Sequence, residues 1–311
     1  MTQVTPSLIK SLREMTGAGL TDCKKALDEA LGNIDKAVIV LREKGLAAAA
    51  KKADRTASEG TVQAVISSDH SYAALYELNC ETDFVTRNDD FQNLNSAISE
   101  GIKNKMPQTL EEVLAVSVNG STIQSQIDAL IAKIGEKIQL RRFTAHKGSW
   151  MSSYIHGLGK IGILVEFASP DIEKIKDNAV FHNLTKDIAL QAAALKPQYL
   201  KKEEIPQTLI DSESKVFETQ YRNQGKPDAA LPKIVAGRLE TWFKECCLNQ
   251  QPFVKEDKKS VSQHIADVAK TLGASLELKY FVRYELGQGI EKKTGDLAKD
   301  VAEQISQVTS H

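Results

Sequence analysis

Three glycines in the run HGLGKIG, at positions 157, 159 and 162, form a G-x-G-x-x-G pattern. In a dinucleotide site this pattern follows a strand and opens a helix, whose amino terminus meets the pyrophosphate. Here the glycines lead into IGILVEF, a run rich in strand-forming residues. We therefore expect a hairpin turn, and a dinucleotide-dependent enzyme remains an alternative.

The histidines and cysteines lack the spacing that metal sites use. The histidines lie at positions 70, 146, 156, 182, 264 and 311, and the cysteines at 23, 80, 246 and 247. Neither set shows C-x-x-C or H-E-x-x-H spacing, and the sequence has no P-loop or G-x-S-x-G motif. We expect no catalytic residue, no metal, no cofactor and reduced thiols. His156, inside the glycine-rich turn, is a functional candidate, and the alternative is an exposed or backbone-bonded turn histidine.

A second segment of interest is CETDFV, residues 80–85, which follows an apolar run and precedes a polar one. In one interpretation Thr82 or Asp83 caps a following helix, and Phe84 is a staple buried in the core. In the other, Phe84 lies at a loop tip beside Asp83. That arrangement would suit a wedge that acts on a charged site of another protein.

The charge balance argues against nucleic acid as a direct partner. Lysine and arginine number 40 against 41 acidic residues, for a net charge of -1, whereas a phosphate-binding surface needs clustered positive charge. The chain start lacks the order of a signal peptide, and no window holds 18 uninterrupted apolar residues. We expect a soluble cytoplasmic protein without a membrane segment, and 311 residues are enough for two or three domains.

The first third of the chain begins with three short amphipathic segments. The runs PSLIKSLREMTG, TDCKKALDEALG and NIDKAVIVLREKG each place apolar residues on one helical face. Thr21 and Asn33 are N-cap candidates, and Gly45 is placed to end the third helix. The Ala- and Lys-rich segment 46–60 then predicts a helical connector.

Strands and helices alternate in blocks through the rest of the chain. Strand-like runs at 61–68 and 72–79 precede helical spacing at 89–102 and 121–138, and a two-strand pattern at 152–169 precedes a helix at 178–195. FQNLNSAI echoes FHNLTKDI, which indicates a duplicated α+β core with antiparallel sheets. Two helices at 207–245 predict a hairpin, and ASLELKYFVRYELG, residues 274–287, alternates like a strand with one apolar face. The parts that we expect are an N-terminal module 1–54, a core N-subdomain 55–140, a core C-subdomain 141–202 completed by 272–290, a helical hairpin 203–248 and a C-terminal strand and helical module 249–311.

Several segments, taken in order, resemble the bacterial elongation factor Ts family. They are SLIKSLREMTGAGLTDCKKALDEALGNIDKA, NCETDFVTRNDDF, YIHGLGKIGILVEF, QPFVKEDKKSV and YELGQGIEKK. The similarity runs from about Ser7 to Lys293, and TGAGLTDCKKAL together with TDFV is specific to the family. The family's fold is a ubiquitin-associated-like three-helix bundle, a two-subdomain core, a coiled-coil hairpin that serves as a dimerisation or partner arm, and a C-terminal module.

The resemblance implies a non-catalytic guanine-nucleotide exchange factor for elongation factor Tu in translation, with a 2:2 assembly allowed. The family's TDFV segment, which dislodges Mg²⁺ from the GTPase, matches Thr82, Asp83, Phe84 and Val85. Other partner contacts would be Arg13, Leu20, Thr21, Lys24, His156 and Val254. Thr21 departs from the family, where a second bulky apolar residue often follows Leu20, so less apolar area would be buried there. A rival hypothesis is an interaction module whose bundle binds a different partner.

Overall fold

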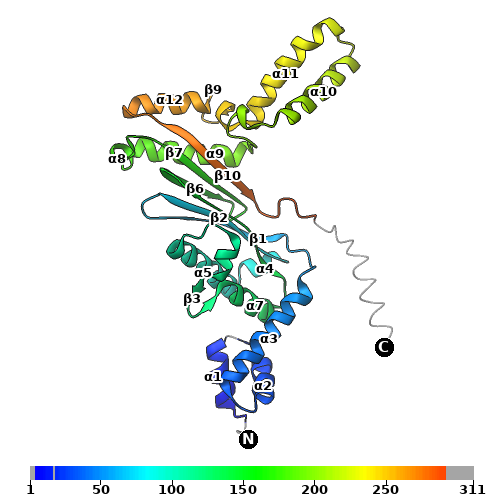
Figure 1. Cartoon of the computed structure of the whole chain (residues 1–311), viewed down its shortest axis with the longest axis vertical. Helices are drawn as coiled ribbons and strands as arrows, with labels where there is room; N and C mark the ends of the chain where they lie inside the picture. Colours follow the sequence, from blue (N-terminus) through cyan, green and yellow to red (C-terminus); the bar gives the residue numbers. More distant parts are fainter. Residues whose placement is uncertain (1–3, 17, 292–311) are drawn as a thin grey trace.

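The described part of the chain, residues 4–16 and 18–291 of a computed structural model, is elongated (Figure 1). A helical bundle, a core of two stacked sheets and a projecting helical hairpin follow one another along its length. The last part of the expected C-terminal module, residues 292–311, lies outside the described residues. The predicted α+β class is confirmed, because the sheets are antiparallel and the helices lie against them, in the separate bundle or in the projecting hairpin.

The N-terminal bundle is built from three helices around a small apolar core. Its helices are α1 (Pro6–Thr16), α2 (Leu20–Glu29) and α3 (Ile34–Lys52). Leu12, Cys23 and Leu27 are fully buried between them. Asn33 caps α3 as predicted, since its side chain accepts the Lys36 amide. The prediction for Thr21 was wrong, because Gly19 is the N-cap residue and Thr21 lies within α2.

Helix α3 continues seven residues beyond Gly45, so the prediction that Gly45 ends it was also wrong. The helix packs against α7 (Ile123–Ile134) of the core, and Gly45 is buried at the contact. A Cβ at this position would lie 3.4 Å from the carbonyl oxygen of Asp128. The contact leaves room for a methyl group but not for a large side chain, so a small residue at this position permits the approach of the two helices. Helix α3 itself ties the bundle to the core.

The first sheet has the strand order β1-β2-β5, with antiparallel neighbours. Its strands are β1 (Glu59–Ile66), β2 (Tyr72–Cys80) and β5 (Ile138–Lys147). Between β2 and β5 the chain forms α4 (Asp83–Thr86), α5 (Asp89–Lys105), α6 (Leu110–Ala115), the small pair β3 (Ser117–Val118) and β4 (Ser121–Thr122), and α7. Phe91 and Ile98 of α5 and Ile127 of α7 pack with Tyr76 of β2 in the core beneath this sheet.

Strand β5 was not predicted, and it corrects two boundaries. The helix expected at 121–138 ends at Ile134, because Gly135 adopts a φ of +87° and donates its N–H to the Ile131 carbonyl. The chain then enters β5 at Ile138, so the expected subdomain boundary at residue 140 falls inside a strand.

The second sheet has the order β10-β7-β6, also antiparallel. Strands β6 (Trp150–His156) and β7 (Ile161–Ala168) form the predicted hairpin, and the strand after the glycines excludes the dinucleotide fingerprint. Strand β10 (Glu277–Glu285) completes the sheet from far along the chain. A bulge between Leu278 and Tyr280 sends Leu278 to the core with α9 but Tyr284 to the core between the sheets, so the expectation of one apolar face was wrong.

The two halves of the core repeat one unit. After β2 come α4 and α5, and after β7 come α8 (Ile172–Ile175) and α9 (Ala179–Leu195). Both long helices have 17 residues and start after an asparagine, Asn88 or Asn178, whose side chain accepts an amide two residues on. Both end at a residue in the left-handed region, Met106 or Lys196. The predicted duplication is therefore visible in the helix caps as well as in the sequence.

The sheets pack face to face, and the helices cover the outer faces (Figure 1). Val62 and Leu75 of the first sheet meet Met151, Leu164 and Tyr284 of the second. Helices α9 and α12 (Val261–Leu272) lie on the second sheet. The helical hairpin, α10 (Gln207–Asn223) and α11 (Leu231–Cys246), projects beyond them. The remaining elements are the short helices η1 (Lys202–Glu204), η2 (Asp228–Ala230) and η3 (Leu248–Gln250) and the pair β8 (Pro252–Phe253) and β9 (Glu256–Ser260).

Candidate functional site

The turn that follows β2 presents an aromatic side chain to solvent. Residues 83–86 form α4, a single helical turn between β2 and α5. Val85 points inward and is buried in the core beneath the first sheet. Phe84 is 79% exposed, and its neighbour Asp83 is exposed as well. The interpretation of Phe84 as a buried staple was therefore wrong, and the loop-tip interpretation matches the structure.

Hydrogen bonds to the loop after α7 hold this turn in place. The amide and the hydroxyl of Thr82 both donate to the Glu136 carboxylate, at 3.0 and 2.8 Å. The preceding residue, Glu81, accepts the Lys137 amide at 2.6 Å and pairs with Arg55. Thr82 occupies the N-cap position, but its side chain makes no capping bond, because Glu136 binds it instead. The turn is thus anchored to a segment 54 residues away in sequence.

The second copy of the repeat shows that the fold needs no aromatic residue here. Counted from the capping asparagines, Val85 corresponds to Ile175, and both are buried with carbonyls that accept the asparagine amide. The position of Phe84 then corresponds to Lys174, whose side chain is also 79% exposed. The same solvent-exposed position of the repeat is a lysine in the second copy and a phenylalanine in the first. The apolar side chain at this position therefore has no structural cause within the repeat.

The tip of the β6–β7 hairpin lies at the same end of the core as this turn. Strand β1 begins at Glu59, which is paired with Cys80, the last residue of β2. Lys160 of the hairpin reaches Glu59, with Nζ 3.1 Å from Oε2. The Gly159 carbonyl accepts the Val62 amide at 2.8 Å. The turn and the hairpin tip are thus neighbours across the start of β1.

His156 ends β6 beside this tip and is exposed. Its Nδ1 lies 3.0 Å from the hydroxyl of Tyr154, which fixes the orientation of the ring. Gly159 has a φ of +89°, and a Cβ there would lie 2.0 Å from Oγ1 of Thr61. The glycine lets the hairpin fit closely against β1, so the structure brings His156 to the same end of the core as Phe84.

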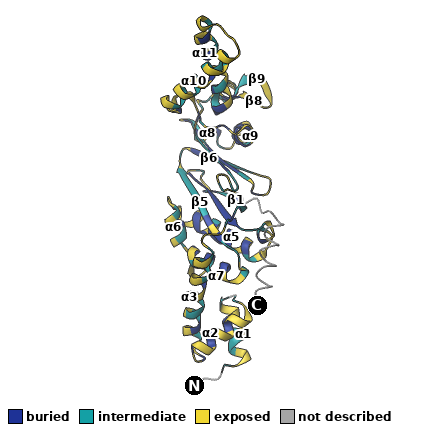
Figure 2. Cartoon of the chain, turned by 90° about the vertical axis from the view of Figure 1, so that its right-hand side faces the viewer, coloured by how far each residue is buried: buried dark blue, intermediate teal, exposed yellow. Residues whose placement is uncertain are grey.

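Four predicted contact residues lie on the surface of the N-terminal bundle. Arg13 is in the last turn of α1, and Leu20, Thr21 and Lys24 are in α2. All four are exposed, on the outer faces of helices that Figure 2 shows as mostly exposed. They form a surface that is separate from the Phe84 turn.

Val254 lies in the turn between β8 and β9, beside helix α9. Its amide donates to the side-chain oxygen of Gln191, at 2.9 Å, and Gln191 is fully buried. The Gln191 amide group in turn donates to the Pro252 carbonyl. The Val254 side chain remains partly exposed on this fixed turn. It belongs to the layer over the second sheet, and the structure does not bring it to the Phe84 turn.

Known proteins resemble this chain over nearly its whole length. A family model described as Elongation factor TS matches residues 81–288. A protein named Elongation factor Ts from Clostridium acetobutylicum is 45% identical over 308 residues, which cover 98% of this chain and 99% of the relative. This chain belongs to the elongation factor Ts family. Two further relatives of that name, from Clostridium kluyveri and Clostridium botulinum, are 41% and 42% identical over 97% of the chain and 99% of their own length.

The four cysteines of this elongation factor Ts family member are free thiols and are buried. Burial, together with the nearby carboxylates of Glu136 and Glu59, raises the pKa of the Cys80 thiol to about 12. Burial also raises the pKa of Cys23. A thiol with a raised pKa holds little of the nucleophilic thiolate at neutral pH. These two cysteines therefore serve packing rather than chemistry.

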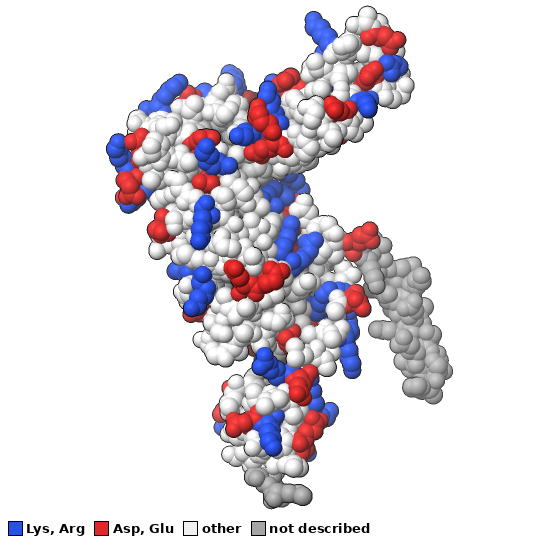
Figure 3. Space-filling model, viewed as in Figure 1, with Lys and Arg blue, Asp and Glu red and all other residues white. Residues whose placement is uncertain are grey.

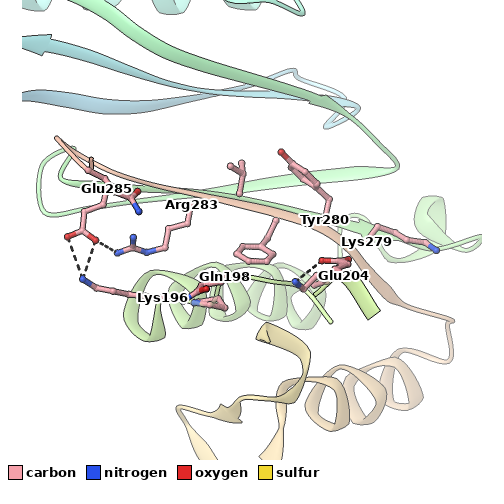
Figure 4. A pocket seen from close by; sticks show the side chains of 12 residues that line it. Lys196, Gln198, Glu204, Lys279, Tyr280, Arg283 and Glu285 are labelled. Carbon is pink, nitrogen blue, oxygen red and sulfur yellow. Dashed lines mark hydrogen bonds and ion pairs between the residues drawn. The ribbon is translucent and has the colours of Figure 1, made fainter. Parts of the chain in front are cut away.

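A cavity of about 850 Å³ lies between β10 and the segment after α9 (Figure 4). Its charged side chains already have partners: Glu285 pairs with both Lys196 and Arg283. Glu204 accepts the Leu200 amide, and Lys279 pairs with Glu277. Across the face in Figure 3, basic and acidic side chains are interspersed.

Within residues 4–16 and 18–291, no group of three or more histidines, cysteines or acids could hold a metal ion. No described helix is long and apolar enough to cross a membrane.

Two exposed apolar residues were missed in the sequence. Met15, near the end of α1, lies close in sequence to Arg13 and is as exposed as Leu20. Leu158, in the hairpin tip, is fully exposed. Helical spacing places Met15 on the same face as Leu8 and Leu12, so the period of α1 predicts burial and could not show its exposure. Leu158 could have been found as the bulky residue between two turn glycines.

Proposed function

We propose that this chain is a guanine-nucleotide exchange factor that acts in the cytoplasm on elongation factor Tu. It binds the GDP-bound GTPase, displaces Mg²⁺ and promotes release of GDP, so that GTP can bind. The main support is the exposure of Phe84 on an anchored turn, in a chain whose relatives are named Elongation factor Ts. In this role the chain catalyses no covalent reaction and needs neither a cofactor nor a contact with nucleic acid.

The physical basis is a coupling between two binding events. GDP is held tightly because Mg²⁺, a lysine and backbone amides of the GTPase all contact its phosphates. A factor can speed release only if it binds the nucleotide-free or strained GTPase better than the loaded one. Coupling of this kind is reciprocal, so the nucleotide weakens factor binding as much as the factor weakens nucleotide binding. The direction of exchange then follows from the relative concentrations of GTP and GDP.

In the proposed exchange reaction, the Phe84 turn is the part of the factor that strains the GTPase. In the proposed role Phe84 inserts between helices of the GTPase and Asp83 contacts a neighbouring helix, which disturbs the Mg²⁺ site. An inserted side chain can displace its surroundings only if its own base is rigid. Thr82, bound to Glu136, and Val85, buried in the core, supply that base.

Other surfaces supply affinity. In the proposal, His156 contacts the GTPase beside the wedge, and Arg13, Leu20, Thr21 and Lys24 dock the N-terminal bundle. Val254 provides a further contact from the layer over the second sheet. We assign these roles to the parts 1–54, 55–147, 148–202 with 272–290, 203–248 and 249–311, in which the boundary between the core subdomains now follows β5. The helical hairpin is proposed as an arm for dimerisation or for a partner in a 2:2 assembly.

Displacement of fluorescent GDP from elongation factor Tu tests the proposal with the variant Phe84→Ala. The variant should bind the nucleotide-free GTPase but lose most of the stimulation of GDP release, because the docking surfaces remain while the wedge is gone. Val180→Ala, which truncates an exposed apolar residue on α9, is the matched control and should behave as wild type. A release rate that is unchanged by Phe84→Ala would refute the wedge role.

A further inference from the structure

Leu158 combines two properties that are unfavourable in the free protein. Its side chain is 100% exposed. Its backbone has a φ of +55°, in the left-handed region that disfavours leucine and suits glycine or asparagine. A polar residue would avoid both costs. A conformational outlier of this kind points to a role outside the folding of the chain.

The hairpin tip holds Leu158 rigidly in this position. On the amino-terminal side, the Lys160 amide donates to the His156 carbonyl at 3.0 Å and closes the turn. On the other side, the Lys160 carbonyl accepts the Leu286 amide at 2.8 Å, from the segment after β10. Gly159 fits against β1 with no room for a side chain. The leucine is therefore an exposed apolar group that loses little backbone freedom when it is buried by a partner.

The position of the tip relates Leu158 to the proposed wedge. Lys160 bonds to Glu59, which pairs with Cys80, two residues before Thr82. His156, a proposed contact, is two residues before Leu158 and on the same turn. The exposed leucine thus lies at the same end of the core as the turn that carries Phe84.

We infer that Leu158 is a second apolar residue that binds elongation factor Tu, at a place beside the one that Phe84 contacts. This inference rests on the proposed function. Leu158 packs on an apolar patch of the GTPase, and burial of a whole leucine side chain on binding corresponds to about tenfold or more in affinity. The free energy gained when Leu158 is buried in the complex offsets the cost of its exposed side chain and strained backbone in the free protein.

The variant Leu158→Asn separates this role from a structural one. Asparagine accepts the left-handed conformation, so thermal stability should be equal to or higher than that of wild type. In the displacement of fluorescent GDP from elongation factor Tu, its half-saturating concentration should rise about tenfold. Leu158→Met, which keeps apolar volume, should retain near-wild-type saturation.

Leu31→Asn is the matched control. Leu31 is a leucine with a φ of +51° and 64% exposure in the turn after α2, where the left-handed backbone ends a helix. This control should leave the saturation curve unchanged. If Leu158→Asn gives the wild-type curve in both half-saturation and maximal rate, the inference is overturned while the exchange function stands. If wild-type protein fails to accelerate GDP release, the proposed function itself fails.

Discussion

The position of the Phe84 turn depends on Glu136, which makes this residue the sharpest test of the rigid wedge. Its carboxylate accepts both the amide and the hydroxyl of Thr82, at 3.0 and 2.8 Å. A hydrogen bond to a charged group contributes roughly 1.5–3 kcal/mol when well shielded. Because Glu136 is only half-buried, we expect about 2 kcal/mol for the pair. Glu136→Ala should therefore raise the population of the opened turn about 30-fold.

Amide hydrogen exchange reports this opening directly. The Arg87 and Asn88 amides donate to carbonyls within the turn, at 3.2 and 3.0 Å, and should exchange about 30-fold faster in Glu136→Ala. Amides of the β1–β2 ladder should keep their protection. Glu136→Gln retains one acceptor oxygen, so its exchange rates at these amides should lie between those of wild type and Glu136→Ala. Glu111 is an exposed acid on α6, and Glu111→Ala should exchange at the wild-type rates. Wild-type exchange at Arg87 and Asn88 in Glu136→Ala would refute the anchoring argument.

Two other changes test the core and the placement of the bundle. Burial raises the pKa of the Glu77 carboxyl, but hydrogen bonds from Gly287, Asn79 and Arg142 outweigh burial and lower it overall. Its stabilising effect should be complete above the unfolded-state pKa and lost as pH falls through the lower folded-state pKa. Glu77→Gln should thus lower the free energy of unfolding, measured in urea, by about 3 kcal/mol at neutral pH and by much less in acid. An equal loss of stability at the two pH values would contradict this. Gly45→Leu should push α3 off α7 and raise the half-saturating concentration for GDP release, whereas Gly45→Ala should not, and superposed curves would refute the docking of α3.

Elements with a clean period could be predicted from the sequence. Helices α5, α9 and α12 and the strand pair β6–β7 follow from their apolar spacing and capping residues. Strand β5 could not be predicted, because Arg141 and Arg142 interrupt its apolar pattern. Both arginines bind the fully buried carboxylate of Glu77. Ile138 and Leu140 of this strand are buried, but two charges that pair with a distant residue follow them, so the local pattern gives no clear strand signal.

The candidate site shows the same limit. Local sequence allows Phe84 to be either a core staple or an exposed tip, since a short turn has no period to decide its inward face. The choice is made by Val85, which fills the core, and by Glu136, which holds Thr82 from another loop. Residues distant in sequence also position Leu158, because the amides of Leu286 and Val62 donate hydrogen bonds to carbonyls of its hairpin tip. Tertiary anchoring therefore determines which residues of these turns are exposed.

The proposed mechanism requires that docking and wedging be separable, and the structure provides separate places for them. If all affinity came from Phe84, each gain in strain on the GTPase would come with an equal loss of binding to its GDP form, and the factor would rarely engage its substrate. In the proposed mechanism, contacts from the bundle and from the β8–β9 turn bind surfaces that need not change with the nucleotide. They can hold the loaded GTPase while the anchored turn acts on it. The energy for distortion then comes from surfaces remote from the phosphates, and loss of any one of them should weaken docking without abolishing the wedge.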